Sequence, residues 1–180
     1  MNRSIAYFLC VFLFVAGVSL AQGKDEQLID WNASGRLTWN DYKARPDPAI
    51  DAAALTTTYL GIEYNITSTG FSYAIQCRFS KDRSWGLHQT DYILEHEQGH
   101  FDIAEIFARK LNRQMKGYQF NRNSYQQDLK KIYNDIMDEK ENFQDSYDKE
   151  TNHSINKEKQ AEWLIKIKTM LEDLKAYSNY

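Results

Sequence analysis

Two histidines and a glutamate stand in the order H-E-x-x-H at His96, Glu97 and His100, within the stretch "LEHEQGHFDIAEIF". On a helix, the two histidines lie about 40° apart around the axis and roughly one turn from each other. Two neutral imidazoles at this spacing can reach the same zinc ion, and the intervening glutamate can reach a water bound to that ion. The pattern therefore indicates a zinc site in which Glu97 acts as the general base.

The alternative interpretation is an amphipathic helix whose histidines are surface residues without a metal. The same helical face carries Ile93, Ile103, Phe107 and Leu111, so the two histidines point toward the core side. Burying two unpaired imidazoles costs free energy, and metal ligation removes that cost. We therefore expect Zn²⁺ at this site.

A zinc site needs further protein ligands, and the sequence offers several. Glu105 is the nearest acid, but it lies about half a revolution from His96 on a straight helix, so a hydrogen bond to a ligand or a surface salt bridge is expected instead. The stretch "SYDKETNHS" holds Asp148, Glu150 and His153 where the chain is expected to turn. His153 is the favoured third ligand because imidazole suits zinc, and Glu150, Asp148 and Glu105 remain as alternatives.

The elements that must position these residues follow from hydrophobic periodicity. Residues 55–67 are rich in β-branched and aromatic side chains, and residues 71–80 alternate strictly between apolar and polar. This predicts an antiparallel hairpin with Cys77 on its buried face. Helical periodicity follows over residues 91–116, 124–147 and 156–177. A small antiparallel sheet followed by three helices predicts an α+β fold.

The N-terminal segment predicts export from the cytoplasm. Residues 1–21 combine Arg3, an apolar run and small residues up to Ala21, which is the layout of a secretory signal peptide cleaved after that alanine. An uncleaved anchor is the alternative, but the apolar run is short and no second one follows, so no stable membrane insertion is expected after cleavage. We expect a periplasmic or extracellular protein with a polar, loosely held lead-in at 22–36 and a single domain at 37–180.

Charge and cysteine content limit the partners and the stabilising chemistry. The chain of 180 residues has a formal net charge of −3 and no basic tract, so nucleic acid is not an expected partner. Removal of residues 1–21 takes away Cys10 and leaves Cys77, so no intramolecular disulfide can form. The fold must then be held by its core, with help from a bound metal. Before the hairpin, Thr38 is expected to cap a short turn.

Four segments together resemble a known bacterial family. These are "LTWNDYKARPDP", "SWGL", "LEHEQGHFDIAEIFARKL" and "YDKETNHSINKEKQAEW". They occur in the order of the family catalogued as domain of unknown function 922, described as predicted secreted zinc-dependent proteases, and they span about Leu37 to Trp163. Ser154 stands where that family is expected to have glycine.

The resemblance implies a zincin-like fold and a zinc metallopeptidase that acts on a peptide or protein substrate. It implies His96 and His100 as zinc ligands, Glu97 as the catalytic residue, and a functional role for residues 147–153. In such a fold a strand beside the active helix binds an extended peptide by strand addition, and residues 71–80 are the candidate. The rival function is a non-catalytic envelope or binding protein that keeps the zinc fold.

Overall fold

The described part of the chain begins with short and long strands and ends with three long helices. The structure is a computed structural model that describes residues 26–50, 52–68 and 70–180. Its elements are β1 (Leu28–Asp30), β2 (Ala54–Leu55), β3 (Thr58–Ile66), β4 (Phe71–Ser80), β5 (Trp85–Gly86), α1 (Asp91–Gly117), α2 (Tyr125–Thr151) and α3 (Lys157–Asp173). The predicted α+β class, with a small antiparallel sheet before three helices, is confirmed. The predicted signal peptide, residues 1–21, lies outside the described residues.

The predicted hairpin is formed by β3 and β4. The two strands are antiparallel, with Thr58 opposite Phe79 at the end nearer the N-terminus of β3. The strict alternation of β4 places Ile75, Cys77 and Phe79 in the core, so the predicted buried position of the cysteine is confirmed. A pleated strand sends alternate side chains to opposite faces, which is why this pattern was readable from sequence.

The edge of β4 that does not pair with β3 pairs with part of the expected lead-in. We expected residues 22–36 to be loosely held, but β1 pairs antiparallel with the end of β4, and the sheet order is β1-β4-β3. Trp31 follows β1, and its Nε1 donates a hydrogen bond of 2.9 Å to Asp102 Oδ1 on α1. A strand of three residues is too short to display alternation, so its sequence resembles a polar linker.

The three helices begin close to their predicted positions. α1 starts after Thr90, whose side chain accepts a hydrogen bond of 3.2 Å from the backbone N–H of Ile93. α3 starts after Asn156, whose side chain accepts a bond of 3.2 Å from Lys159 N. Both are N-caps that satisfy a free donor of the first turn. The third helix is shorter than predicted, because α3 ends at Asp173 and a short 3-10 helix follows.

The second helix is one turn longer than predicted, and this matters for the site. Its apolar stripe ends at Tyr147, but the helix continues to Thr151. The hydroxyl of Thr151 donates 2.7 Å to the carbonyl of Tyr147, and Asn152 closes the helix in the left-handed conformation. Asp148 therefore lies on a helix and not in the turn where we expected it.

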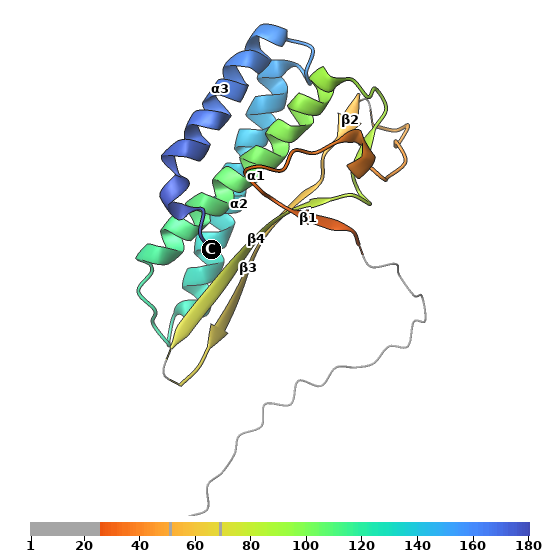
Figure 1. The fold of residues 1–180 in the computed structure, drawn as a ribbon. Helices are drawn as coiled ribbons and strands as arrows, with labels where there is room; N and C mark the ends of the chain where they lie inside the picture. The colour runs from red at the N-terminus through yellow and green to blue at the C-terminus, as the bar shows by residue number, and fades with distance from the viewer. Residues whose placement is uncertain (1–25, 51, 69) are drawn as a thin grey trace, which may run out of the picture.

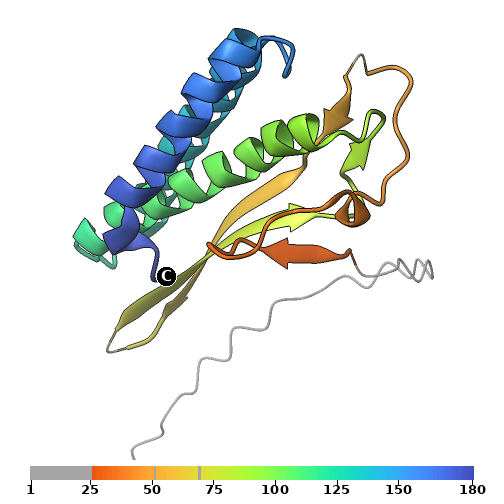
Figure 2. The ribbon, with the colours of Figure 1, turned by 45° about the horizontal axis from the view of Figure 1, so that its top comes forward.

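The helices lie side by side over one face of the sheet (Figure 1). α1 lies between the sheet and the other two helices (Figure 2), and it packs against β3, β4, α2 and α3. Its side chains are buried almost all round from His96 to Met115. The largest fully buried apolar side chains include Phe79, Ile103, Phe107, Leu111, Tyr147 and Ile167. Across the described residues, no helix combines the length and apolar character needed to cross a membrane.

A small lobe covers the N-terminal half of α1. β2 and β5 pair with each other there, and Thr38 begins the predicted short turn at Trp39–Asp41. The backbone N–H and hydroxyl of Thr38 both donate to Asp41 Oδ2, at 2.9 and 2.8 Å. The Trp39 ring lies against Gly86, where an added Cβ would come within 2.4 Å of it. This contact ties the turn to β5.

Candidate metal centre

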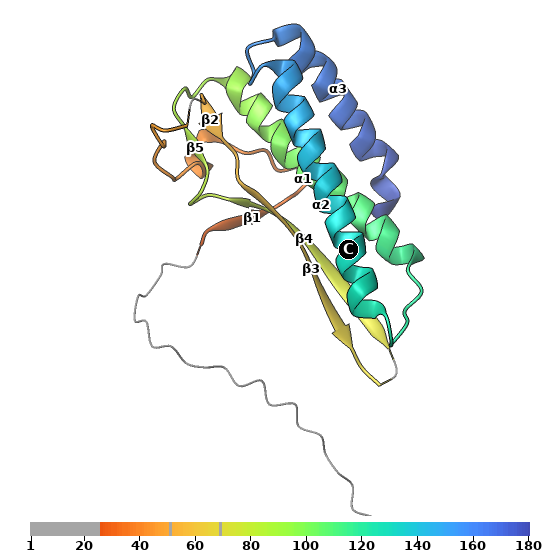
Figure 3. The same ribbon diagram turned by 180° about the vertical axis from the view of Figure 1, so that it is seen from behind.

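Two histidines of α1 and one aspartate of α2 bring three potential ligand atoms together. His96 Nε2 lies 3.2 Å from His100 Nε2. Both nitrogens face the same oxygen, Asp148 Oδ1, at 3.1 Å for His96 and 3.0 Å for His100. The two helices that carry them, α1 and α2, pack side by side, and β2 contacts α1 (Figure 3).

The spacing of these three atoms fits a zinc ion. Around a tetrahedral ion with bonds of about 2.0–2.1 Å, ligand atoms lie roughly 3.3 Å apart. Hydrogen bonding explains the cluster less well, because two imidazole nitrogens that face each other can share one proton at most. Two imidazoles and one carboxylate also match the donor types of zinc sites that keep an open position for water.

The three ionisable groups influence one another strongly. Burial disfavours protonation of His100, but its hydrogen bond to Asp148 and the charge of Glu97 outweigh this and raise its pKa to about 9. Burial lowers the pKa of His96 despite the same carboxylate. Burial also opposes ionisation of Asp148, yet hydrogen bonds from His100 and His96 hold its pKa well below the usual range. Without metal at neutral pH, the cluster therefore holds a proton on His100.

Gln144, which the sequence motif did not identify, orients His100. The Nδ1–H of His100 donates to Gln144 Oε1 at 2.6 Å, and Gln144 Nε2 donates back to the His100 carbonyl at 3.0 Å. A hydrogen bond at Nδ1 fixes the ring and leaves Nε2 free to bind a metal in the neutral tautomer. Gln144 precedes Asp148 by one helical turn on the same side of α2. That spacing is the signal that sequence reasoning had available.

Glu97 lies beside His96 and faces the same cavity. It is 4% exposed, and its Oε2 has no hydrogen-bond partner among the described residues. A buried carboxylate oxygen without a partner costs free energy unless it meets water or a ligand. The free oxygen of Glu97 can therefore accept a hydrogen bond from a molecule in the cavity.

The cavity at the cluster has a volume of 480 Å³. Its walls come from α1, from α2 and from residues 52–58, which include β2 and the start of β3. Residues 71–80, the strand we expected to bind a peptide, do not line it. β4 is also the middle strand of its sheet, paired on both edges, whereas residues 52–58 share the cavity with the histidines and Asp148.

The structure separates the four candidates for a third ligand. Asp148 lies within the cluster, whereas His153 lies at its edge, with Nδ1 3.7 Å from Asp148 Oδ1 and a side chain that is 65% exposed. Glu150 accepts a hydrogen bond of 2.8 Å from Trp163 Nε1. Glu105 accepts one of 2.8 Å from Arg109 in a buried ion pair, and not in the surface pair that we expected.

The chain after α2 has three consecutive residues in the left-handed backbone conformation, and two of them line the cavity. Asn152, His153 and Ser154 are consecutive and have φ values of 48°, 50° and 72°. For a residue other than glycine, the left-handed conformation costs about 1–2 kcal/mol, although asparagine tolerates it better. His153 and Ser154 both line the cavity as a result. Backbone strain of this kind gathers at functional sites.

The fold and the cluster define an α+β protein with two histidines and a carboxylate gathered beside a cavity. Residues 23–154 match the family model described as Bacterial protein of unknown function (DUF922), and the chain belongs to this family. The matched region includes His96, Glu97, His100, Asp148 and the left-handed run, and it ends before α3. Comparison with curated proteins and with solved structures shows no match.

Proposed function

We propose that the protein is a zinc-dependent hydrolase that cleaves peptide bonds in an exported peptide or protein substrate. The observation that carries the proposal is the triangle of His96, His100 and Asp148 ligand atoms beside the unpartnered carboxylate of Glu97. A zincin-like architecture, in which a helix carries both histidines and the base, is consistent with the position of these residues on α1. Export rests on the predicted signal peptide at residues 1–21.

The residues that would hold zinc are His96, His100 and Asp148. The sequence favoured His153 as the third ligand, but the distances favour Asp148, whose Oδ1 is within 3.1 Å of both imidazoles. His153 is proposed to act at the rim of the cavity, where its exposed imidazole can reach a bound substrate. Zinc, when bound, supplies a Lewis acid that activates water and polarises the substrate carbonyl.

The chain's own residues would then move the protons. Glu97 accepts a proton from the attacking water through its unpartnered oxygen, and passes it to the nitrogen of the leaving amine when the C–N bond breaks. Gln144 keeps His100 in the required tautomer throughout. The segment 52–58, which lines the same cavity, is proposed to align an extended substrate.

A paired measurement of metal content and peptide cleavage tests this function. Wild-type protein purified without chelators is expected to contain one zinc ion per chain and to cleave members of a mixed peptide library. Glu97→Gln is expected to keep the zinc and to lose cleavage by at least about 100-fold, because the base is gone but the ligands remain. The control is Glu95→Gln, which makes the same change at an exposed position of α1.

Two results would contradict the proposal. Protein that binds no zinc in solution would remove the metal site. Zinc-loaded wild type and Glu97→Gln protein with the same cleavage products would point to a contaminating protease and to the rival binding function.

A further inference from the structure

We propose that Tyr147 of α2 and Gly99 of α1 form a lock that sets the register between the two helices and thereby positions the cluster's ligand atoms. The effect on zinc rests on the proposed function, but the lock itself is a property of the metal-free fold. Tyr147 is a positioning residue in this proposal, because it contacts the histidines and not the substrate.

Gly99 provides a notch that the Tyr147 ring fills. An added Cβ at Gly99 would lie 2.5 Å from Tyr147 Oη, 2.9 Å from Cζ and 3.1 Å from Cε1. No real Cβ comes this close, so any side chain at position 99 must displace the tyrosine ring or separate the helices. Glycine lowers helix stability in the interior of a helix, so its presence here needs a compensating contact. The tyrosine ring is that contact.

Tyr147 also controls the ring of His96. Its Oη donates to the His96 carbonyl at 3.2 Å, and its ring stacks on the imidazole with centroids 4.5 Å apart and an angle of 21°. His96 Nδ1 has no hydrogen-bond partner in the described part of the chain. Stacking therefore holds the orientation of this imidazole ring, as the hydrogen bond to Gln144 does for His100. Trp163 of α3 also packs against the tyrosine, with ring centroids 5.5 Å apart.

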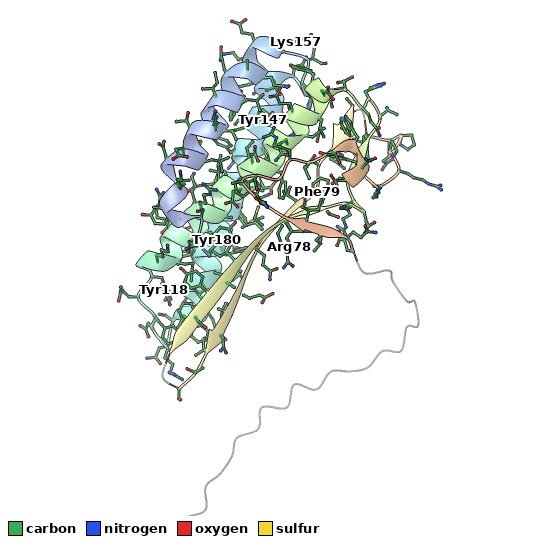
Figure 4. The ribbon with its side chains drawn as sticks, viewed as in Figure 1. Arg78, Phe79, Tyr118, Tyr147, Lys157 and Tyr180 are labelled. Atoms are coloured by element: carbon green, nitrogen blue, oxygen red, sulfur yellow. The ribbon has the colours of Figure 1, made fainter. Side chains whose placement is uncertain are left out.

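The sequence positions connect the lock directly to the cluster. Gly99 immediately precedes His100, and Tyr147 immediately precedes Asp148. Tyr147 is fully buried at the meeting of the helices (Figure 4). If α2 slid along α1 by one residue, Asp148 would move by about 1.5 Å relative to the histidines. Metal–ligand bonds tolerate about 0.2 Å, so register errors far smaller than one residue disrupt the site.

A double-mutant cycle in the metal-free protein tests the lock. Gly99→Ala, Tyr147→Leu and the double variant are compared with wild type by denaturant unfolding in the presence of EDTA. We expect Gly99→Ala to lower the unfolding midpoint clearly, and to cost much less when the tyrosine ring has been removed by Tyr147→Leu. Gly117→Ala is the matched control, because a Cβ there meets nothing within 4 Å and should cause no loss.

Zinc affinity, measured by competition with a chromophoric chelator, tests the positioning role. Gly99→Ala and Tyr147→Leu are each expected to weaken zinc binding at least tenfold, and the double variant is expected to bind no more tightly than Tyr147→Leu, although Gly99→Ala then costs little further stability. Tyr147→Phe keeps the ring and the stacking, so it should stay within about threefold of wild type. If the lock affected stability alone, zinc affinity would stay at the wild-type level in each variant that is folded.

Each result decides the proposal. Additive losses of stability in the cycle, or wild-type zinc affinity in Gly99→Ala, would overturn it. If Gly99→Ala fails to fold, a folded double variant supports the lock and an unfolded one contradicts it, since the clash then lies elsewhere. Absence of zinc binding in the wild type would overturn the proposed function. The double-mutant cycle in EDTA would still test the lock, because it measures the stability of the metal-free protein.

Discussion

Asp148 and His153 approach the two histidines in different ways. Asp148 Oδ1 lies 3.0 Å and 3.1 Å from their Nε2 atoms, whereas the exposed His153 ring lies beyond it. We therefore expect Asp148→Asn to weaken zinc binding by at least about 100-fold, because the site loses its anionic ligand. His153→Ala should weaken it by less than about tenfold. Chelator competition with both variants checks this, and the opposite ranking would restore His153 as the third ligand.

The proton on His100 makes zinc binding depend on pH. Its pKa is raised to about 9, because the hydrogen bond to Asp148 and the charge of Glu97 outweigh the effect of burial. Zinc must displace this proton, so apparent affinity should rise with pH, by up to about tenfold per unit, and level off above pH 9. Calorimetry at pH 7 in buffers of different ionisation enthalpy should show about one proton released. Affinity that is constant between pH 6 and 9 would contradict this protonation state.

At the scale of single elements, the left-handed run after α2 is the clearest departure from standard geometry. Ser154 has a φ of 72°, and the family resemblance led us to expect glycine there. Ser154→Gly removes the steric cost of this conformation but increases the entropy of the unfolded chain. We expect a net gain of about 0.5–1 kcal/mol in the free energy of unfolding. Denaturant titration of the metal-free protein measures it.

Asn152→Gly is the matched control for this substitution. Asparagine tolerates the left-handed conformation at φ 48° better than serine does, so the gain at position 152 should be smaller. A Ser154→Gly variant that is less stable than wild type would mean that the serine side chain contributes more than its backbone costs.

The elements also show how far sequence patterns reach. β4 and the start of α1 carry strong periodicity and a clear N-cap, and they were predicted within a residue. The last turn of α2 was missed because its residues 148–151 are polar and do not continue the apolar stripe. Asp148 was therefore placed in a turn, and its approach to the two histidines could not be predicted. That approach depends on contacts between helices, such as Tyr147 against Gly99, which no local pattern encodes.

At the scale of the whole molecule, α1 connects two polar regions. Its N-terminal half carries the two histidines of the candidate metal centre, and its C-terminal half contacts residues 177–180. Asn112 Nδ2 donates to the carbonyls of Tyr177 and Asn179, at 2.8 and 3.2 Å, and the Tyr180 hydroxyl donates to Glu105. Tyr177, Asn179 and Tyr180 lie beyond the region that matches the family, which ends at residue 154, whereas the residues they contact lie within it. The tail should therefore stabilise the helices without taking part in the site.

Deletion of residues 178–180 tests this separation. The deletion leaves Glu105 without its tyrosine partner and removes one acceptor of Asn112, so the free energy of unfolding should fall by about 1–3 kcal/mol. Tyr180→Phe, which removes the hydroxyl alone, should account for part of that loss. Zinc affinity should stay within about twofold of wild type in both variants, because the tail contacts α1 from Glu105 onward and the ligands precede it. A large loss of zinc affinity on deletion would mean that the two halves of α1 are energetically coupled, and that the tail supports the site through the helix they share.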